Sequence, residues 1–222
     1  MVSIKERLAE AEELFAKGKQ DEAFERYSDL LNDPKLKSEE FFRVMQRRGG
    51  ILSERSLYDE ARDVYLTAVA KAMQQGKNQR ASEFWHLIGI NEVAAGRLEA
   101  AISDFRRELD LSSSRYENYF FQLSTNYYEQ GSVFLALGDL DESRMYFELA
   151  LAFAETDGIP LAEARAHDGL GRYYEAAGND ADALMHIASA LSQYNEAKDR
   201  AGAQRMRRLS KRIKDRMKPE KA

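Results

Sequence analysis

One short pattern recurs five times along the chain, at intervals of about 40 residues. Each copy has a turn residue, usually glycine, then acidic and small residues, and a large apolar residue four positions after the last small one. Another small residue precedes the turn residue by seven positions. The small residue after the turn falls at positions 23, 61, 101, 143 and 183, so the spacings are 38, 40, 42 and 40. A repeat this regular constrains the chain to one structural unit stacked on copies of itself.

Each copy is expected to be a hairpin of two helices. A glycine just after a helix can adopt the left-handed conformation that ends it, and acidic residues fit the first turn of the next helix. The turn residues are Gly18, Ser56, Gly96, Gly138 and Gly178. The small residues before them are Ala11, Gly49, Gly89, Gly131 and Gly171, and the large residues after them are Tyr27, Tyr65, Phe105, Phe147 and Ile187. We expect each small residue to let the two helices approach, with the large residue filling the space beside them.

This unit resembles the tetratricopeptide repeat, and the resemblance covers nearly the whole chain. The third copy has the fullest version, with Trp85, Gly89, Gly96, Ala101 and Phe105. The family repeat is about 34 residues long, so we expect longer helices here. The resemblance implies an all-α, right-handed α-solenoid of five helical hairpins plus a C-terminal capping helix. The expected repeats are 4–37, 38–77, 78–113, 114–158 and 160–198, and residues 199–222 form a basic capping helix and tail.

Composition and motif content speak against an enzyme. The chain of 222 residues has no cysteine, which excludes a disulfide scaffold, a thiolate zinc site and a thiol nucleophile. The three histidines, His86, His167 and His186, are expected in different repeats and show no metal-ligand spacing. No glycine-rich phosphate loop is present. We therefore expect neither catalysis nor a cofactor or metal.

The chain is expected to be soluble and cytoplasmic. Its start does not read as a signal peptide, and no apolar run approaches the roughly 20 residues that a membrane-spanning helix needs.

The resemblance implies that the first helix of each hairpin lines a concave groove. We expect the groove to hold a protein or peptide ligand, with an acidic or C-terminal segment as the candidate, because arginine binds carboxylates well and tyrosine gives rigid contact area. The candidate binding residues are Arg43, Gln46, Arg47, His86, Tyr128, Glu129, Arg165, Asp168 and Arg172. The alternative is that the four arginines pair internally with Glu83, Glu129 and Asp168.

Two variants of the family bear on the expected ligand. Repeats that clamp the C-terminal carboxylate of chaperones use asparagine one position after the first small residue. Here that position has Glu12, Gly50, Ile90, Ser132 and Arg172, so a chaperone clamp is not expected. The longer repeat is similar to that of bacterial regulators that sense short peptides. The first repeat begins near Met1, so this chain would be only the sensing half.

Two further alternatives stay open. The chain could be a scaffold that self-assembles into a homo-oligomer, and the candidate patches are Phe41-Phe42 and Tyr119-Phe120-Phe121. Residues 198–222 include eleven Lys or Arg and three acids, so their net charge is +8 and the remainder of the chain is at −13. This segment is either a solubilising cap, with an apolar stripe of Met206, Leu209, Ile213 and Met217, or a contact for an acidic partner. It has no aromatic residue, so nucleic-acid binding there would be purely electrostatic, and nucleic acid is not the expected partner.

Overall fold

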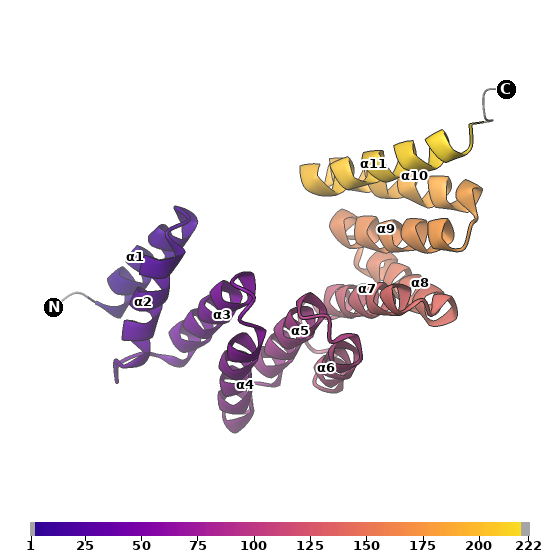
Figure 1. Cartoon of the computed structure of the whole chain (residues 1–222). Coiled ribbons are helices and arrows are strands. Elements are labelled where there is room, and N and C mark those ends of the chain that lie inside the picture. The colour runs from indigo at the N-terminus through magenta and orange to yellow at the C-terminus, as the bar shows by residue number, and fades with distance from the viewer. Residues whose placement is uncertain (1–2, 219–222) are drawn as a thin grey trace. The chain divides into compact units, whose positions relative to one another are not determined.

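The computed structural model describes residues 3–218, except for the side chain of Asp157. Within this range the chain forms eleven α-helices and no strand, as the repeat predicts (Figure 1). The helices are α1 (Ile4–Ala16), α2 (Gln20–Leu31), α3 (Ser38–Glu54), α4 (Tyr58–Gln74), α5 (Asn78–Ala94), α6 (Leu98–Asp110), α7 (Tyr119–Leu137), α8 (Leu140–Asp157), α9 (Pro160–Ala176), α10 (Asp180–Glu196) and α11 (Arg200–Arg216). None of these helices is both long enough and apolar enough to cross a membrane.

Consecutive helices pack as hairpins. The pairs are α1 with α2, α3 with α4, α5 with α6, α7 with α8 and α9 with α10, and α11 packs on α10. The chain divides into two compact units, Met1–Leu111 and Ser112–Ala222, called here the first and the second unit. The division falls between α6 and α7, where eight residues, 111–118, lie outside helices and where the repeat spacing reaches 42. The two units are described separately.

All five predicted turn residues have the left-handed conformation. The glycines have φ between 74° and 80°, and Ser56 has φ 61° although it carries a side chain. Lys198, between α10 and α11, also has positive φ, at 59°. A non-glycine residue in this region costs about 1–2 kcal/mol, so the repeat geometry is imposed at both positions against local preference.

The small residue on the first helix packs directly against the large residue on the second, as expected. A Cβ atom added to Gly89 would lie 2.5 Å from the ring of Phe105, and one added to Gly131 would lie 2.8 Å from Phe147. Gly49 opposes Tyr65 and Gly171 opposes Ile187 in the same way. Glycine is therefore needed at these positions for contact between helices, since a methyl group would overlap the ring or side chain opposite.

The last helix seals the second unit. Met206, Leu209 and Ile213 are buried on α10, as the apolar stripe predicts. Met217 was expected to continue the stripe, but it is the C-cap residue and is 54% exposed. The buried stripe therefore ends one turn earlier than expected.

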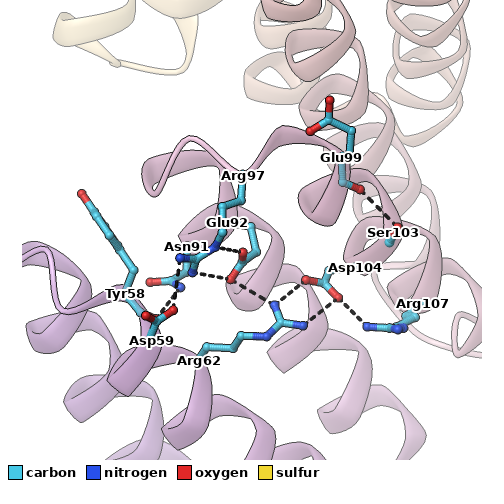
Figure 2. Close-up of polar contacts among 10 residues, drawn as sticks. All are labelled: Tyr58, Asp59, Arg62, Asn91, Glu92, Arg97, Glu99, Ser103, Asp104 and Arg107. Atoms are coloured by element: carbon cyan, nitrogen blue, oxygen red, sulfur yellow. Dashed lines mark hydrogen bonds and ion pairs between the residues drawn. The ribbon is translucent and has the colours of Figure 1, made fainter.

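An ion-pair network holds the second and third hairpins together in the first unit (Figure 2). The buried carboxylates of Glu92 on α5 and Asp104 on α6 are only 2% and 1% exposed. Arg62 of α4 lies between them, 3.0 Å from Glu92 and 2.7 Å from Asp104. Arg97 pairs with Glu92, and Arg107 lies 2.7 Å from Asp104. Because each buried carboxylate has two arginine partners, neither charge is left uncompensated.

Candidate functional site

The predicted groove residues divide between the two units. Arg43, Gln46, Arg47 and His86 lie in the first unit, on α3 and α5. Tyr128 and Glu129 of α7 and Arg165, Asp168 and Arg172 of α9 lie in the second.

Two of the four candidates of the first unit, Arg47 and His86, pair internally. Arg47 lies 2.9 Å from Glu12 of α1, and its guanidinium lies 4.8 Å from the centre of the Phe15 ring. The Nδ1 atom of His86 lies 2.9 Å from a carboxylate oxygen of Glu108 on α6. Gln46 is exposed on α3. Arg43 is exposed too, and it lines a pocket of about 360 Å³ together with Lys5, Leu8, Ala9, Glu12, Glu39 and Glu40.

Three candidates of the second unit share one pocket of about 480 Å³. They are Tyr128, Asp168 and Arg172, and they come from the first helices of the fourth and fifth hairpins. The other wall is α11, the basic helix considered above as a separate binding surface. The full lining is Tyr128, Asp168, Arg172, Arg205, Met206, Arg208, Leu209 and Arg212. The groove and the basic helix are thus two walls of the same pocket, called here the arginine pocket.

Arg172 is held in place by hydrogen bonds and by contacts with aromatic rings. Its Nε donates to Asp168 at 3.1 Å, one turn earlier on α9. Its Nη2 donates to the hydroxyls of Tyr128 and Ser132 on α7, at 3.1 and 3.0 Å. Its guanidinium also lies 5.5 Å from the centre of the Tyr128 ring. The side chain therefore joins α9 to α7 with one face of the cation directed at an aromatic ring.

Asp168 is the anionic centre of the pocket. Its carboxylate is buried, and it accepts a hydrogen bond of 3.0 Å from the Tyr194 hydroxyl of α10. Arg205 of α11 lies 3.7 Å from the same carboxylate. Burial raises the pKa of the Tyr194 hydroxyl, and the negative charge of Asp168 raises it further. Tyr194 is therefore a protonated donor at neutral pH.

The arginines of α11 are held to different degrees. Arg212 makes two hydrogen bonds to Glu175 of α9, at 2.6 and 2.9 Å. The polar contacts of Arg205 are long, at 3.7 Å to Asp168 and 3.5 Å to the Tyr194 hydroxyl, its guanidinium lies 5.7 Å from the centre of the Tyr194 ring, and its side chain is 57% exposed. Arg208 is exposed and has no hydrogen bond or ion pair within the described part of the chain. Two of the three cations are therefore available to a ligand.

Glu129 and Arg165 lie beside the pocket and are not part of its lining. Both are half-buried. Burial is the main cause of the raised pKa of the Tyr128 hydroxyl, and the charges of Arg172, Asp168, Glu129 and Arg165 act on it in that order with opposing signs. Glu129 and Arg165 have opposite charges and so leave the charge balance of the pocket unchanged.

The three histidines do not lie in three separate repeats, which corrects the expectation from sequence. His167 of α9 and His186 of α10 belong to the same hairpin, and their Nδ1 atoms lie 2.9 Å apart. The Tyr174 ring stacks on His186 at 5.3 Å between centres. His167 precedes Gly171 by four residues and His186 follows Ala183 by three, so the repeat register places both on the interface between the two helices. Within residues 3–218 no group of three or more His, Asp or Glu side chains is arranged to hold a metal ion.

The two patches proposed for self-assembly differ. Phe42 is buried and Phe41 packs against the same core in the first unit, so this patch is internal. Phe120 is 38% exposed and stacks on Phe153, which begins a row of aromatic contacts along α7 and α8 through Tyr127, Tyr146 and Phe134. Most of this second patch is the ordinary interface of the fourth hairpin.

A family model matches part of the chain. Residues 122–196, which form most of α7 to α10, match the family described as tetratricopeptide repeat. No curated protein matches the sequence.

Solved structures with the same fold are similar at low sequence identity. One is the apo form of RapI, with a TM-score of 0.70 and 15% identity, covering 88% of this chain and 54% of RapI. Another is the putative kinesin light chain of Podosopora anserina with its nearly identical TPR-like repeats. Its TM-score is 0.66 and its sequence identity is 13%, and the match covers 89% of this chain and 96% of that one. A third is PH0952 of Pyrococcus horikoshii, a signal transduction ATPase with a tetratricopeptide repeat sensor. Its TM-score is 0.79 and its sequence identity is 12%, and the match covers 97% of this chain and 33% of that one. The chain thus spans about half the length of RapI and a third of PH0952, and the likeness is one of fold.

Proposed function

We propose that this chain, whose residues 122–196 match tetratricopeptide repeats, is a non-enzymatic recognition module that binds a segment of a partner protein in the arginine pocket. Such repeats generally serve protein–protein interaction, but fold alone does not fix a function. The observation that carries the proposal is the convergence of Tyr128, Asp168 and Arg172 with the arginines of α11 on one pocket. Its volume of about 480 Å³ lies in the range of ligand-binding pockets.

The charge of the pocket supports binding over a purely structural role. A structural ion-pair network balances its charges. In the first unit three arginines face three carboxylates, namely Arg62, Arg97 and Arg107 against Glu92, Asp104 and Asp59. The arginine pocket has four arginines against the carboxylates of Asp168 and Glu175, which leaves an excess of two positive charges. A segment with complementary charge would remove that excess, and oppositely charged surfaces of this kind accelerate and select association.

Site-specific photocrosslinking tests the proposal. Benzoylphenylalanine is placed at position 212 in the pocket wall and, as a control, at position 185, where Met185 is 56% exposed on α10. The full chain is irradiated in cell lysate, and crosslinked peptides are mapped by mass spectrometry. The expected result is one discrete partner segment crosslinked at position 212 and absent at position 185. Equal crosslinking at the two positions, or none at 212, would remove the proposal.

A second candidate is that the chain is the sensing part of a larger signalling protein. It is favoured by the likeness to PH0952, in which a tetratricopeptide repeat sensor makes up part of a longer chain. In that case the ligand is a small peptide rather than a segment of a stable partner. The lysate fraction below about 3 kDa should then raise the melting temperature of the protein, and Arg208→Glu should abolish that increase.

A further inference from the structure

We infer that the arginine pocket selects a peptide segment carrying a doubly charged anionic group beside an aliphatic side chain, and that Arg205 and Arg208 recognise the anion. This inference rests on the proposed function and adds the chemical class of the ligand. It assigns the recognition to two residues of α11, outside the groove positions indicated by the repeat.

The choice of these two arginines follows from how the four cations are engaged. Arg172 has its Nε and Nη2 donors directed at Asp168, Tyr128 and Ser132, and a ligand would have to break those bonds to use these two atoms. Arg212 is similarly held by the carboxylate of Glu175. These two side chains form the scaffold of the pocket, because the Nε and Nη2 atoms of both are hydrogen-bonded within the protein and hold each guanidinium in place.

Arg205 and Arg208 remain for the ligand. They are three residues apart on α11, so they lie on the same face of the helix. Arg205 keeps its contacts at 3.5 Å or longer, and Arg208 has no hydrogen bond or ion pair to any residue that the structure describes. A guanidinium group forms paired hydrogen bonds to carboxylate and phosphate oxygens, and these charge-assisted bonds are about twice as strong as neutral ones.

The excess positive charge of the pocket indicates how many negative charges the ligand carries. Four arginines against two carboxylates leave two positive charges. A single carboxylate would neutralise one of them, whereas a phosphorylated side chain, with a charge of about −1.5 to −2 at pH 7, neutralises both. An acidic residue at a free C-terminus also places two negative charges on one residue. The two sources share the chemistry, and the experiment separates them.

The pocket also has an apolar surface next to the cations. Met206 and Leu209 are on the same helix as the two arginines and line the pocket while being mostly buried. Burial of an aliphatic side chain against them contributes roughly 25 cal/mol for each Å² of apolar surface removed from water. The favoured ligand therefore has a leucine-like residue adjacent to the charged one.

The same surface speaks for a peptide rather than nucleic acid. Bases bind single-strand proteins by stacking on exposed aromatic rings. The aromatic residue of the lining is Tyr128, whose ring is engaged by Arg172 and packs on Phe147. A phosphodiester also carries one negative charge where the pocket has an excess of two.

Three fluorescein-labelled peptides are the probes, titrated into the full chain and followed by fluorescence anisotropy. The first is Ala-Leu-phosphoserine-Leu-Ala with a C-terminal amide, the second has serine in place of phosphoserine, and the third ends in Leu-Asp with a free carboxylate. We expect the phosphoserine or the Leu-Asp peptide to bind at least about tenfold tighter than the serine peptide. Which of the two binds tighter identifies the source of the dianion.

Matched variants on one helix locate the effect. Arg208→Gln and Arg205→Gln should each reduce binding of the preferred peptide about tenfold. Arg207→Gln is the control, because Arg207 is exposed on α11, has one contact of 3.4 Å to Asn195 and is not part of the lining. Circular dichroism establishes that the three variants are equally folded.

Three outcomes would overturn the inference. One is equal affinity for the three peptides, another is an equal loss from Arg207→Gln and Arg208→Gln, and the third is tighter binding of a thymidine oligonucleotide that depends on Arg208. If position 212 still crosslinks a partner segment while the dianionic peptides show no preference, the proposed function stands and this inference fails. If position 212 crosslinks no partner segment and the dianionic peptides show no preference, both the proposed function and this inference fail.

Discussion

The hydroxyl of Tyr194 on α10 donates a hydrogen bond of 3.0 Å to the carboxylate of Asp168 on α9. Both side chains are buried, and the same carboxylate also accepts from Arg172 and faces Arg205. The anionic centre of the pocket is thereby fixed to the core of the fifth hairpin.

Replacement of that tyrosine is expected to weaken the hairpin. Tyr194→Phe keeps the ring and removes one donor to a buried charge, so the free energy of unfolding should fall by about 1–3 kcal/mol. Urea denaturation followed by circular dichroism measures the change. Tyr173→Phe is the control, because the Tyr173 hydroxyl makes no hydrogen bond among residues 3–218. Equal stability of the two variants would contradict the role given to the bond.

Two adjacent glycines of α3 are expected to respond in opposite directions. A Cβ atom at Gly49 would overlap the Tyr65 ring, so Gly49→Ala should destabilise the first unit by about 1–3 kcal/mol. Nothing lies within 4 Å of a Cβ at Gly50, so Gly50→Ala should stabilise it by about 0.5–1 kcal/mol. Thermal unfolding of the two single variants is the measurement. If both variants lost stability, helix propensity would not determine the effect of Gly50→Ala, and the prediction would be wrong.

The ion-pair network of the first unit should be sensitive to loss of its central cation. Arg62→Met leaves the buried carboxylates of Glu92 and Asp104 with one arginine each, and the expected loss is about 3 kcal/mol. Trp85 is the single tryptophan and lies on α5, so its fluorescence reports unfolding of this unit. Arg106→Met on exposed α6 surface is the control. The triple variant with Glu92→Gln and Asp104→Asn should recover part of the loss, and no recovery would argue against uncompensated charge as the cause.

The histidine pair predicts a loss of stability on mild acidification. Burial lowers the pKa of His167 to about 4, and the neighbouring His186 contributes, whereas the unfolded chain has the ordinary value of 6.5. The unfolded state therefore binds more protons than the folded state between pH 6.5 and 4. The contribution of neutral His167 to the free energy of unfolding is complete above pH 6.5 and is lost as the pH falls toward 4. For a partly exposed pair the effect between pH 7.5 and 5 is of order 1 kcal/mol.

Melting temperatures at pH 7.5 and 5.0 check this prediction. The double variant His167→Phe and His186→Phe should lose less stability between the two values than the unchanged chain. Carboxylates contribute little in this window, because their ordinary pKa values lie below it. An identical pH dependence of the two proteins would show that the pair is not responsible.

The fold could be predicted from sequence because the signal was periodic. The five turn residues and the pairs such as Gly89 with Phe105 occur at fixed offsets, and the structure has them in contact. Even the serine at position 56 adopts the conformation that the pattern requires. Periodicity specifies these contacts because both partners belong to one hairpin.

The site was less predictable because its contacts join residues far apart. Arg47 was placed in the groove, but whether Glu12, 35 residues earlier, would pair with it depends on how α1 and α3 pack. Arg205 and Arg208 were recognised only as part of a basic helix, since the rotation of α11 against α9 decides which of its cations reach the pocket. His167 and His186 were missed although the repeat register was sufficient to bring them together. Whether the nine groove residues bind a ligand stays a prediction.

Two neighbouring faces of helix α11 have different roles. Met206, Leu209 and Ile213 fix it to the fold, and Arg205, Arg208 and Arg212 supply the wall of the pocket. Substitutions on the second stripe leave the first untouched, so ligand preference can drift over evolutionary time with little penalty in folding. A family of such chains could share one scaffold and differ in specificity through positions 205 and 208 of a single helix, and the same two positions are where a designer would begin to redirect it.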